Sequence, residues 1–146
     1  MAKFEASTII NRPVDDVWKF VTDLSNAPEC FVNTVEFKQT SPGPLGVGTT
    51  LLHRALRRTF TGHVTEYEPN QRFTTEATSG PIKGSSEVFT FEAIDGKTRL
   101  TYTGNLKASG FYGLVEPFIM GRIVRQGQAE VEAKVANVKH LLESGR

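Results

Sequence analysis

The chain has 146 residues, a length typical of a single domain, and 38% of them are apolar. Its 17 lysines and arginines nearly balance its 16 aspartates and glutamates, which leaves a net charge of +1. Proteins that bind nucleic acids or anionic membrane surfaces usually carry a clear excess of positive charge. The balance therefore argues against both classes, and we expect no nucleic-acid partner.

Cysteine usage and the N-terminal sequence indicate a compartment. Cys30 is the only cysteine, so an internal disulfide cannot form, which fits a reducing environment. A packed thiol is the simpler interpretation of Cys30, because no Cys-His motif marks it as a nucleophile. The N-terminus lacks the basic and apolar regions of a signal peptide, and no stretch has the ~18 apolar residues of a membrane span. We expect a cytoplasmic protein without a membrane span.

The first 32 residues predict a strand followed by two short helices. Residues 3–10 have strand composition and lead into Pro13, which fits the first turn of a helix because its missing N–H costs nothing there. Pro28 marks a break, and a second, shorter helix is predicted over residues 27–32. The first helix is indicated by apolar residues at helical spacing, namely Val14, Val17, Trp18, Val21 and Leu24.

The middle of the chain predicts a run of strands. Short stretches alternate between apolar and polar residues and are separated by sequences rich in glycine and proline. The clearest turn is Asp95-Gly96, a pair that favours a two-residue hairpin between two alternating runs. The predicted strands cover residues 35–40, 49–57, 59–67, 72–78, 85–94 and 98–105.

From about residue 114 to residue 143 the apolar period changes from two to 3.6, which predicts one long amphipathic helix. Glu130 and Lys134 stand four residues apart on it, in the order that favours an ion pair. Gly127 interrupts the apolar stripe, which consists of Met120, Val124, Val131, Val135, Val138 and Leu142.

The predicted fold class is α+β. A seven-stranded antiparallel sheet needs one face covered, and the C-terminal helix is the only element long enough to cover it. We therefore expect residues 1–146 to form a single domain, in which a curved sheet wraps around the long C-terminal helix. The two short helices lie between the first and second strands.

Several short motifs occur in a characteristic order, and the long helix follows them. They are Ile10-Asn-Arg-Pro13 before Val17-Trp18, Gly43-Pro-Leu-Gly-Val-Gly-Thr49, Val64-Thr-Glu-Tyr-Glu-Pro69 before Arg72-Phe73, and Asp95-Gly-Lys-Thr-Arg-Leu-Thr101. In this order the chain resembles the START-like or SRPBCC superfamily, whose fold is called the helix grip, and most closely its bacterial polyketide cyclase/dehydrase group. Cys30-Phe31 departs from relatives that often carry tryptophan nearby. The superfamily includes lipid-transfer domains, hormone receptors, aromatase/cyclases and co-chaperones, so the resemblance implies a fold and leaves the function open.

The strand pattern places aromatic and polar side chains on one face of the sheet. Val35 shares a face with Phe37, as Phe73 does with Thr75. Such a face is either plain core or the wall of a pocket. Gly127, the polar tips of this set and the resemblance favour a pocket. The expected ligand-binding residues are Phe37, His53, Phe73, Phe89, Phe91, Tyr102, Phe111, Tyr112, Met120, Val124 and Gly127.

His53 is the candidate that carries the most chemistry. If Leu51 and Ala55 point inward, strand alternation points His53 inward as well. An inward histidine can bind a ligand oxygen or move a proton near neutral pH. The alternatives are a satisfied core histidine, or an outward one if the register shifts by one residue. Residues 79–84 and 104–113 are either lids over the pocket or ordinary connections.

The sequence contains no catalytic metal, nucleophile or phosphate-binding motif, and we expect no metal or cofactor. The leading hypothesis is a binding or carrier protein for a hydrophobic small molecule such as a lipid, polyketide or isoprenoid-like compound, acting as a monomer or weak homodimer. One alternative is an enzyme of the polyketide cyclase/dehydratase type, with His53 and Tyr102 as catalytic candidates. The other is a co-chaperone-like protein-interaction module, which an exposed apolar patch would favour.

Overall fold

The computed structural model describes residues 2–31, 33–55, 57–107 and 111–145, with all of their side chains except those of Ala2 and residues 111–124. The helices are α1 (Val14–Thr22), the 3₁₀ helix η1 (Leu24–Asn26), α2 (Ala27–Cys30) and α3 (Phe111–Glu143). The strands are β1 (Ala2–Ile10), β2 (Thr34–Gln39), β3 (Thr50–Ala55), β4 (Arg58–Glu68), β5 (Arg72–Ala77), β6 (Ser86–Ile94) and β7 (Lys97–Leu106).

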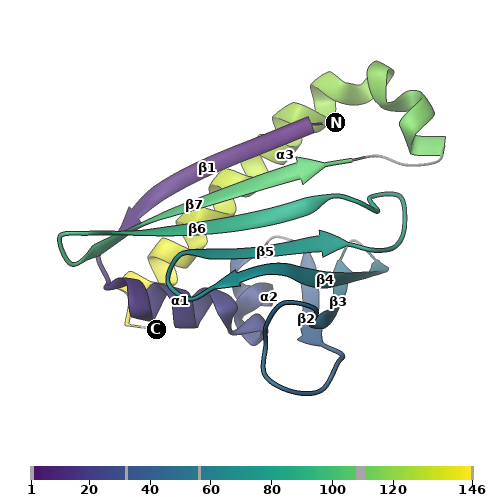
Figure 1. The fold of residues 1–146 in the computed structure, drawn as a ribbon. Coiled ribbons are helices and arrows are strands. Elements are labelled where there is room, and N and C mark those ends of the chain that lie inside the picture. The colour runs from purple at the N-terminus through teal and green to yellow at the C-terminus, as the bar shows by residue number, and fades with distance from the viewer. Residues whose placement is uncertain (1, 32, 56, 108–110, 146) are drawn as a thin grey trace.

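The strands form one antiparallel sheet in the order β1-β7-β6-β5-β4-β3-β2. Strands β2 to β7 follow each other as hairpins, while β1 crosses over to pair with β7, so β1 and β2 are the two edges. Figure 1 shows the sheet curving, with α3 running beside β1 and with α1 and α2 gathered at one end. This arrangement confirms the predicted α+β helix-grip fold.

Local sequence explains the tightest turns. Asp95 and Gly96 both have positive φ, 48° and 78°, and Ile94 pairs directly with Lys97. Positive φ at both central positions is the hairpin geometry that Asp-Gly favours, and the sequence prediction is confirmed. In the turn between β4 and β5, Asn70 has a φ of 63° and the backbone N–H of Gln71 donates to the carbonyl of Glu68 at 2.9 Å. Asparagine tolerates this left-handed conformation better than most residues.

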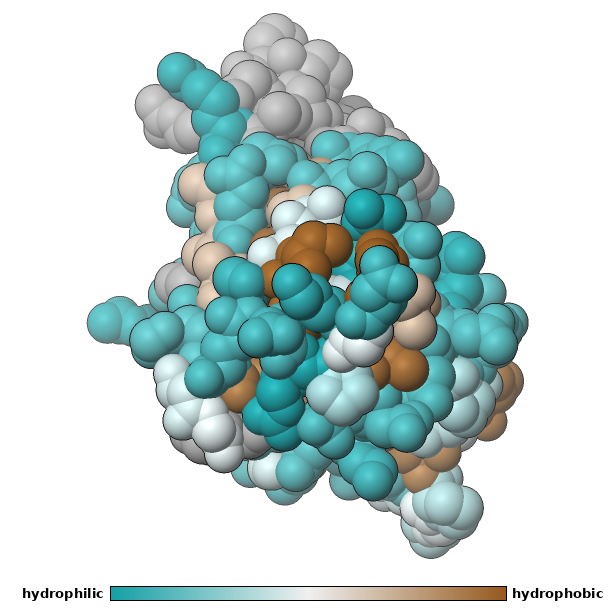
Figure 2. Space-filling model, turned by 90° about the vertical axis from the view of Figure 1, so that its left-hand side faces the viewer, coloured by the Kyte–Doolittle hydropathy of each residue, from teal (hydrophilic) through white to brown (hydrophobic). Residues whose placement is uncertain are grey.

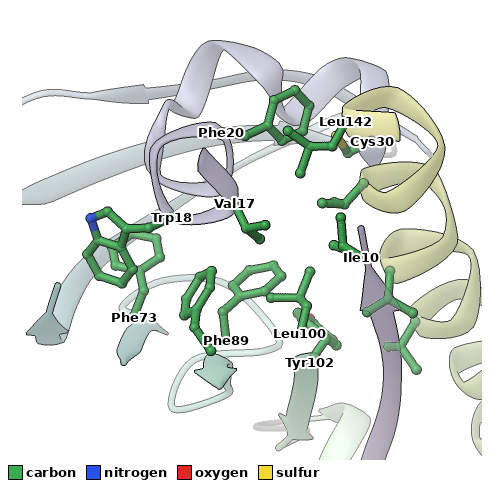
Figure 3. Packing of buried hydrophobic residues seen from close by; sticks show 14 of the residues in the cluster. Ile10, Val17, Trp18, Phe20, Cys30, Phe73, Phe89, Leu100, Tyr102 and Leu142 are labelled. Carbon is green, nitrogen blue, oxygen red and sulfur yellow. The ribbon is translucent and has the colours of Figure 1, made fainter. Parts of the chain in front are cut away.

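One end of the sheet is filled by side chains beneath α1. Trp18 lies edge-on against three rings, with centroid distances of 5.3 Å to Tyr67, 6.3 Å to Phe73 and 5.1 Å to Phe91. Figure 3 shows Trp18 beside Phe73, with Val17 pointing toward the strands. Each fully buried side chain of this kind stabilises the fold by about 1.5–3 kcal/mol. The amphipathic pattern of α1 therefore produces a solid core at this end.

The C-terminal helix is fastened to the edge strand β1. The side-chain amide of Gln128 donates to the carbonyl of Glu5 at 2.8 Å, and Lys139 Nζ donates to the carbonyl of Ile9 at 2.6 Å. These bonds occupy edge groups that would otherwise be open to another strand. The predicted apolar stripe of α3 faces the sheet in its described part, where Val131, Val135, Val138 and Leu142 are buried.

One prediction about β2 is wrong. Val35 is 67% exposed and does not share an inner face with Phe37. The register of β2 against β3 shifts between Thr34 and Glu36, which is the signature of a β-bulge. A bulge inserts one residue, so it reverses the inward and outward alternation locally. Thr34 takes the buried position, and Val35 turns outward.

Candidate ligand-binding cavity

A cavity of about 400 Å³ lies between the sheet and α3, at the end of the sheet that α1 does not fill. Its apolar walls come from β1, β2, β3, β4, β7, α3 and the loop between β5 and β6. Its lining includes the exposed residues Asn33 and Gln126, so it reaches the surface. This volume is within the usual range for small-molecule sites. The apolar lining residues include Phe4, Phe37, Leu51, Ala55, Phe60, Ile82, Leu106 and Val131.

A second and much smaller cavity, of about 20 Å³, lies beneath α1 and α2. It shares Phe37, Thr75 and Glu87 with the main cavity. It is large enough for about one water molecule. These shared residues therefore mark the boundary between the filled and the hollow ends of the sheet.

A polar cluster projects from β6, β7 and α3 into the main cavity. Lys134 Nζ lies 3.3 Å from Glu87 Oε1 and donates to the hydroxyl oxygen of Tyr102 at 3.1 Å. The ammonium also lies over two rings, 5.0 Å from the centroid of Phe31 and 4.5 Å from that of Tyr102. Buried charges of this kind persist where they are paired and hydrogen-bonded. Among the described residues, no buried side-chain nitrogen or oxygen lacks a hydrogen-bond partner.

The electrostatics fix the protonation of the acidic groups in this cluster. Burial raises the pKa of Glu87, but the charges of Lys134 and His53 and the hydrogen bonds from Tyr102 and Lys134 outweigh it, so the pKa lies below 4.5. Burial, followed by the charge of Glu87, raises the pKa of Tyr102 well above 10.0. At neutral pH Glu87 is therefore a carboxylate, and Tyr102 keeps its proton and donates it in a hydrogen bond to Glu87.

His53 lines the same cavity from β3. Its Nε2 lies 3.0 Å from Thr34 Oγ1, and its ring centroid lies 4.9 Å from that of Phe37 and 6.2 Å from that of Phe60. Burial lowers the pKa of His53, the charge of Glu87 opposes that shift, and the charge of Lys134 adds to it. The imidazole is therefore predominantly neutral at pH 7, where it can accept a proton.

The structure brings four of the predicted site residues to the main cavity: Phe37, His53, Tyr102 and Gly127. The others divide into two groups. Phe73, Phe89 and Phe91 are buried beneath α1 and α2, where Phe73 and Phe89 line the small cavity. The remaining four are Phe111, Tyr112, Met120 and Val124, whose side chains lie outside the described part of the structure.

Gly127 lines the cavity, and its missing side chain also accommodates a neighbouring ring. A Cβ atom on Gly127 would lie 2.6 Å from two ring carbons of Phe4, closer than atoms can approach. The space left by the missing side chain is therefore occupied by the ring of Phe4, which forms part of the cavity wall. Glycine at this position lets β1 approach α3.

Sequence reasoning missed Glu87 and Lys134. Lys134 was expected to pair with Glu130 along the helix, but it reaches across to Glu87 on β6 instead. A signal was present in the sequence, because Glu87 has the same strand parity as Phe89 and Phe91. A charged residue on the apolar face of a strand indicates a partner or a site.

The loop at residues 79–84 forms part of the cavity wall. Ile82 lines the cavity, and the backbone N–H of Gly84 donates to the carbonyl of Ala77 at 2.9 Å. Ala77 in turn donates to the carbonyl of Ser85 at 2.8 Å, so both ends of the loop are held to the sheet. Of the other predicted lid, Gly104, Asn105 and Leu106 line the cavity, and residues 108–110 lie outside the described part.

Two features that would define other classes of protein are absent from the described residues. None of their His, Cys, Asp and Glu side chains gather into a group of three or more that could hold a metal ion. In the described part of the chain, no helix is both long and apolar enough to cross a membrane.

A curved sheet gripping a C-terminal helix around a cavity defines a helix-grip protein. The family described as polyketide cyclase / dehydrase and lipid transport matches residues 1–143, and the chain belongs to this family. No curated protein matches the chain.

Several solved structures share the fold. The di-domain ARO/CYC BexL from the BE-7585A biosynthetic pathway is 18% identical with a TM-score of 0.76, over 98% of this chain and 47% of that one. The di-domain ARO/CYC StfQ from the steffimycin pathway is 14% identical with a TM-score of 0.74, over 97% and 50%. TTHA0849 from Thermus thermophilus is 13% identical with a TM-score of 0.79, over 99% and 100%. The chain thus spans about half the length of the two di-domain proteins.

Proposed function

We propose that the protein binds or carries a hydrophobic small molecule, such as a lipid, polyketide or isoprenoid-like compound, in the main cavity. The observation that carries this proposal is the cavity of about 400 Å³, which reaches the surface and is lined by apolar residues with a few convergent polar groups. Apolar walls with a small number of placed polar groups are typical of small-molecule sites. Membership of a family described by lipid transport and polyketide cyclase/dehydrase supports the same class of ligand.

Native mass spectrometry tests this proposal. Protein purified from its own host should carry a stoichiometric hydrophobic adduct that denaturing extraction releases. A matched pair of variants locates the adduct. Ala77 lines the cavity, so Ala77→Phe should place a ring there and abolish the adduct, while Ala93→Phe at an exposed position of β6 should retain it. An empty protein that fatty acids, flavonoids and polyketide mimics also fail to stabilise would overturn the proposal.

A second candidate is an enzyme of the cyclase/dehydratase type, and His53 is the observation that favours it. A neutral imidazole in an apolar cavity is suited to take a proton from the carbon between two carbonyl groups. Tyr102 is not suited to act as a base, because its raised pKa keeps the hydroxyl protonated. The similar folds of BexL and StfQ, both ARO/CYC proteins, agree with this candidate.

Substituting His53 separates the two candidates. For an enzyme that uses this residue, His53→Ala should lower turnover of a poly-β-ketone substrate by about 10²-fold. For a carrier, the same change should alter affinity only modestly.

A protein-interaction module has less support. The large apolar side chains that are exposed in the described residues are Ile9, Val35 and Val47, which come from three separate segments. On the face shown in Figure 2, apolar residues gather only in small patches within a hydrophilic surface. Docking surfaces are usually larger and contiguous.

A further inference from the structure

The two charged groups of the cavity cluster are unequally open to the cavity. The side chain of Glu87 is 32% exposed, whereas that of Lys134 is 16% exposed. The ammonium of Lys134 is already engaged by Glu87, by the Tyr102 hydroxyl and by two aromatic rings. A bound molecule therefore meets the carboxylate of Glu87, a hydrogen-bond acceptor, more readily than it meets the ammonium.

That carboxylate has room for another donor. A carboxylate has roughly four lone-pair positions, and Lys134 and Tyr102 occupy two of those on Glu87. Hydrogen bonds to an ionised acceptor are shorter and stronger than those between neutral groups. A hydroxyl group entering the cavity can therefore gain a charge-assisted hydrogen bond at Glu87.

The charges of the cavity also disfavour an anionic ligand. The described lining residues include three glutamates, Glu76, Glu87 and Glu130. Lys134 is the one lysine or arginine in the described lining. A ligand carboxylate would lose its hydration and would lie beside like charges without a cation of its own. His53 supplies little positive charge at pH 7, because burial lowers its pKa from 6.5.

We propose that the cavity selects an uncharged hydrophobic molecule with a hydroxyl group, an alcohol or a phenol, whose O–H donates to Glu87, and that it excludes hydrophobic carboxylates such as free fatty acids. This inference rests on the proposed function and narrows it. It assigns Glu87 as the residue that determines specificity and Lys134 as a positioning residue that holds the carboxylate in place.

The test uses three naphthalenes that differ in one substituent: 2-naphthol, 2-naphthoic acid and 2-methylnaphthalene. At neutral pH they present a hydroxyl, a carboxylate and a methyl group on the same ring system. Isothermal titration calorimetry on the wild-type protein should show 2-naphthol binding about tenfold more tightly than either of the others.

Two variants assign the preference to Glu87. Glu87→Gln should remove most of the advantage of naphthol over methylnaphthalene, and it should strengthen naphthoate binding because Lys134 is no longer neutralised. Glu92→Gln is the matched control, since Glu92 is an exposed carboxylate on the same strand, 3.2 Å from Arg99. It should leave all three affinities unchanged.

The outcomes separate this inference from the proposed function. Naphthoate binding as tightly as naphthol to the wild-type protein would overturn the inference and leave hydrophobic binding intact. Failure of 2-naphthol to bind more tightly than 2-methylnaphthalene would also overturn the inference, while the adduct measured by native mass spectrometry decides the proposed function separately. The wild-type comparison needs no substitution, so it decides the inference even if Glu87→Gln does not fold.

Discussion

Replacing Lys134 with methionine tests the ion pair between Lys134 and Glu87 in the cavity lining. The change keeps the length and apolar packing of the side chain but leaves Glu87 without its cation. Exposed ion pairs contribute about 0–1 kcal/mol, and breaking a fully buried pair costs about 3–5 kcal/mol. With exposures of 16% and 32%, this pair lies between the two limits. We expect Lys134→Met to lower the free energy of unfolding by about 2 kcal/mol at pH 7, which corresponds to a Tm lowered by about 6 °C.

The stability that Lys134→Met loses should depend on pH, and the direction of this dependence follows from the pKa of Glu87. In the wild-type protein the pKa of Glu87 lies below its usual 4.5, so the stability it contributes is complete above pH 4.5 and is lost as the pH falls through the folded-state pKa. Without Lys134, we expect burial, which is the largest influence on Glu87, to raise its pKa. The folded variant then favours the protonated carboxyl, and its stability decreases as the pH rises through that raised pKa. The difference in Tm should therefore be smaller at pH 4 than at pH 7 and should grow across this range.

Thermal unfolding followed by circular dichroism over this pH range measures the effect. The double variant Lys134→Met/Glu87→Gln should recover most of the lost stability, because it removes the unpaired charge. Arg99→Met is the control, since Arg99 and Glu92 form an exposed pair and its loss should cost less than about 1 kcal/mol. A loss of equal size at pH 4 and pH 7, or a double variant no more stable than Lys134→Met, would refute this account.

Three further predictions concern the core, the helix and the histidine. Trp18→Ala should destabilise the protein by about 3–5 kcal/mol in chemical denaturation, because it empties the space beneath α1. Gly127→Ala should gain about 1 kcal/mol of helix propensity but push the ring of Phe4 into the cavity, so titrations should show weaker ligand binding with little net change in stability. Because the pKa of His53 is lowered from 6.5, its neutral form stabilises the fold above pH 6.5 and that contribution is lost as the pH falls through the folded-state pKa. Melting curves of His53→Gln should therefore lose this acid dependence, and those of His140→Gln should retain it.

Local patterns predicted the fold well because its turns and faces depend on local chemistry. The Asp95-Gly96 hairpin requires only two residues with positive φ and alternating runs on either side. The stripe of Val131, Val135 and Val138 specifies which side of α3 faces the sheet. The sequence could not predict the bulge in β2, because the position of the bulge depends on pairing with β3 and not on the β2 sequence alone.

The site was predicted less completely because strand parity specifies a face and not a position along it. Parity offered an inner position for His53 only if Leu51 and Ala55 point inward, and in the structure both His53 and Tyr102 line the cavity. It could not show that α1 covers Phe91 and leaves Phe37 at the cavity, because that depends on where the short helices dock.

Glu87 and Lys134 illustrate a further limit. They are 47 residues apart, and helical spacing offered Glu130 as a nearer partner for the lysine. A contact between a strand and a distant helix follows from the tertiary arrangement, which propensity and periodicity do not encode.

The division of the sheet into a filled end and a hollow end has a consequence for how binding and stability are linked. Trp18 at the filled end contributes to folding and does not line the cavity, so substitutions there should change stability without changing specificity. His53 lies at the hollow end and lines the cavity, so substitutions there should also affect the site. Glu87 lines both cavities and is paired with Lys134, so it contributes to the fold and to the site at once. A ligand hydroxyl that donates to Glu87 further stabilises its ionised form, and binding should therefore protect the protein most strongly at pH values where Glu87 is charged.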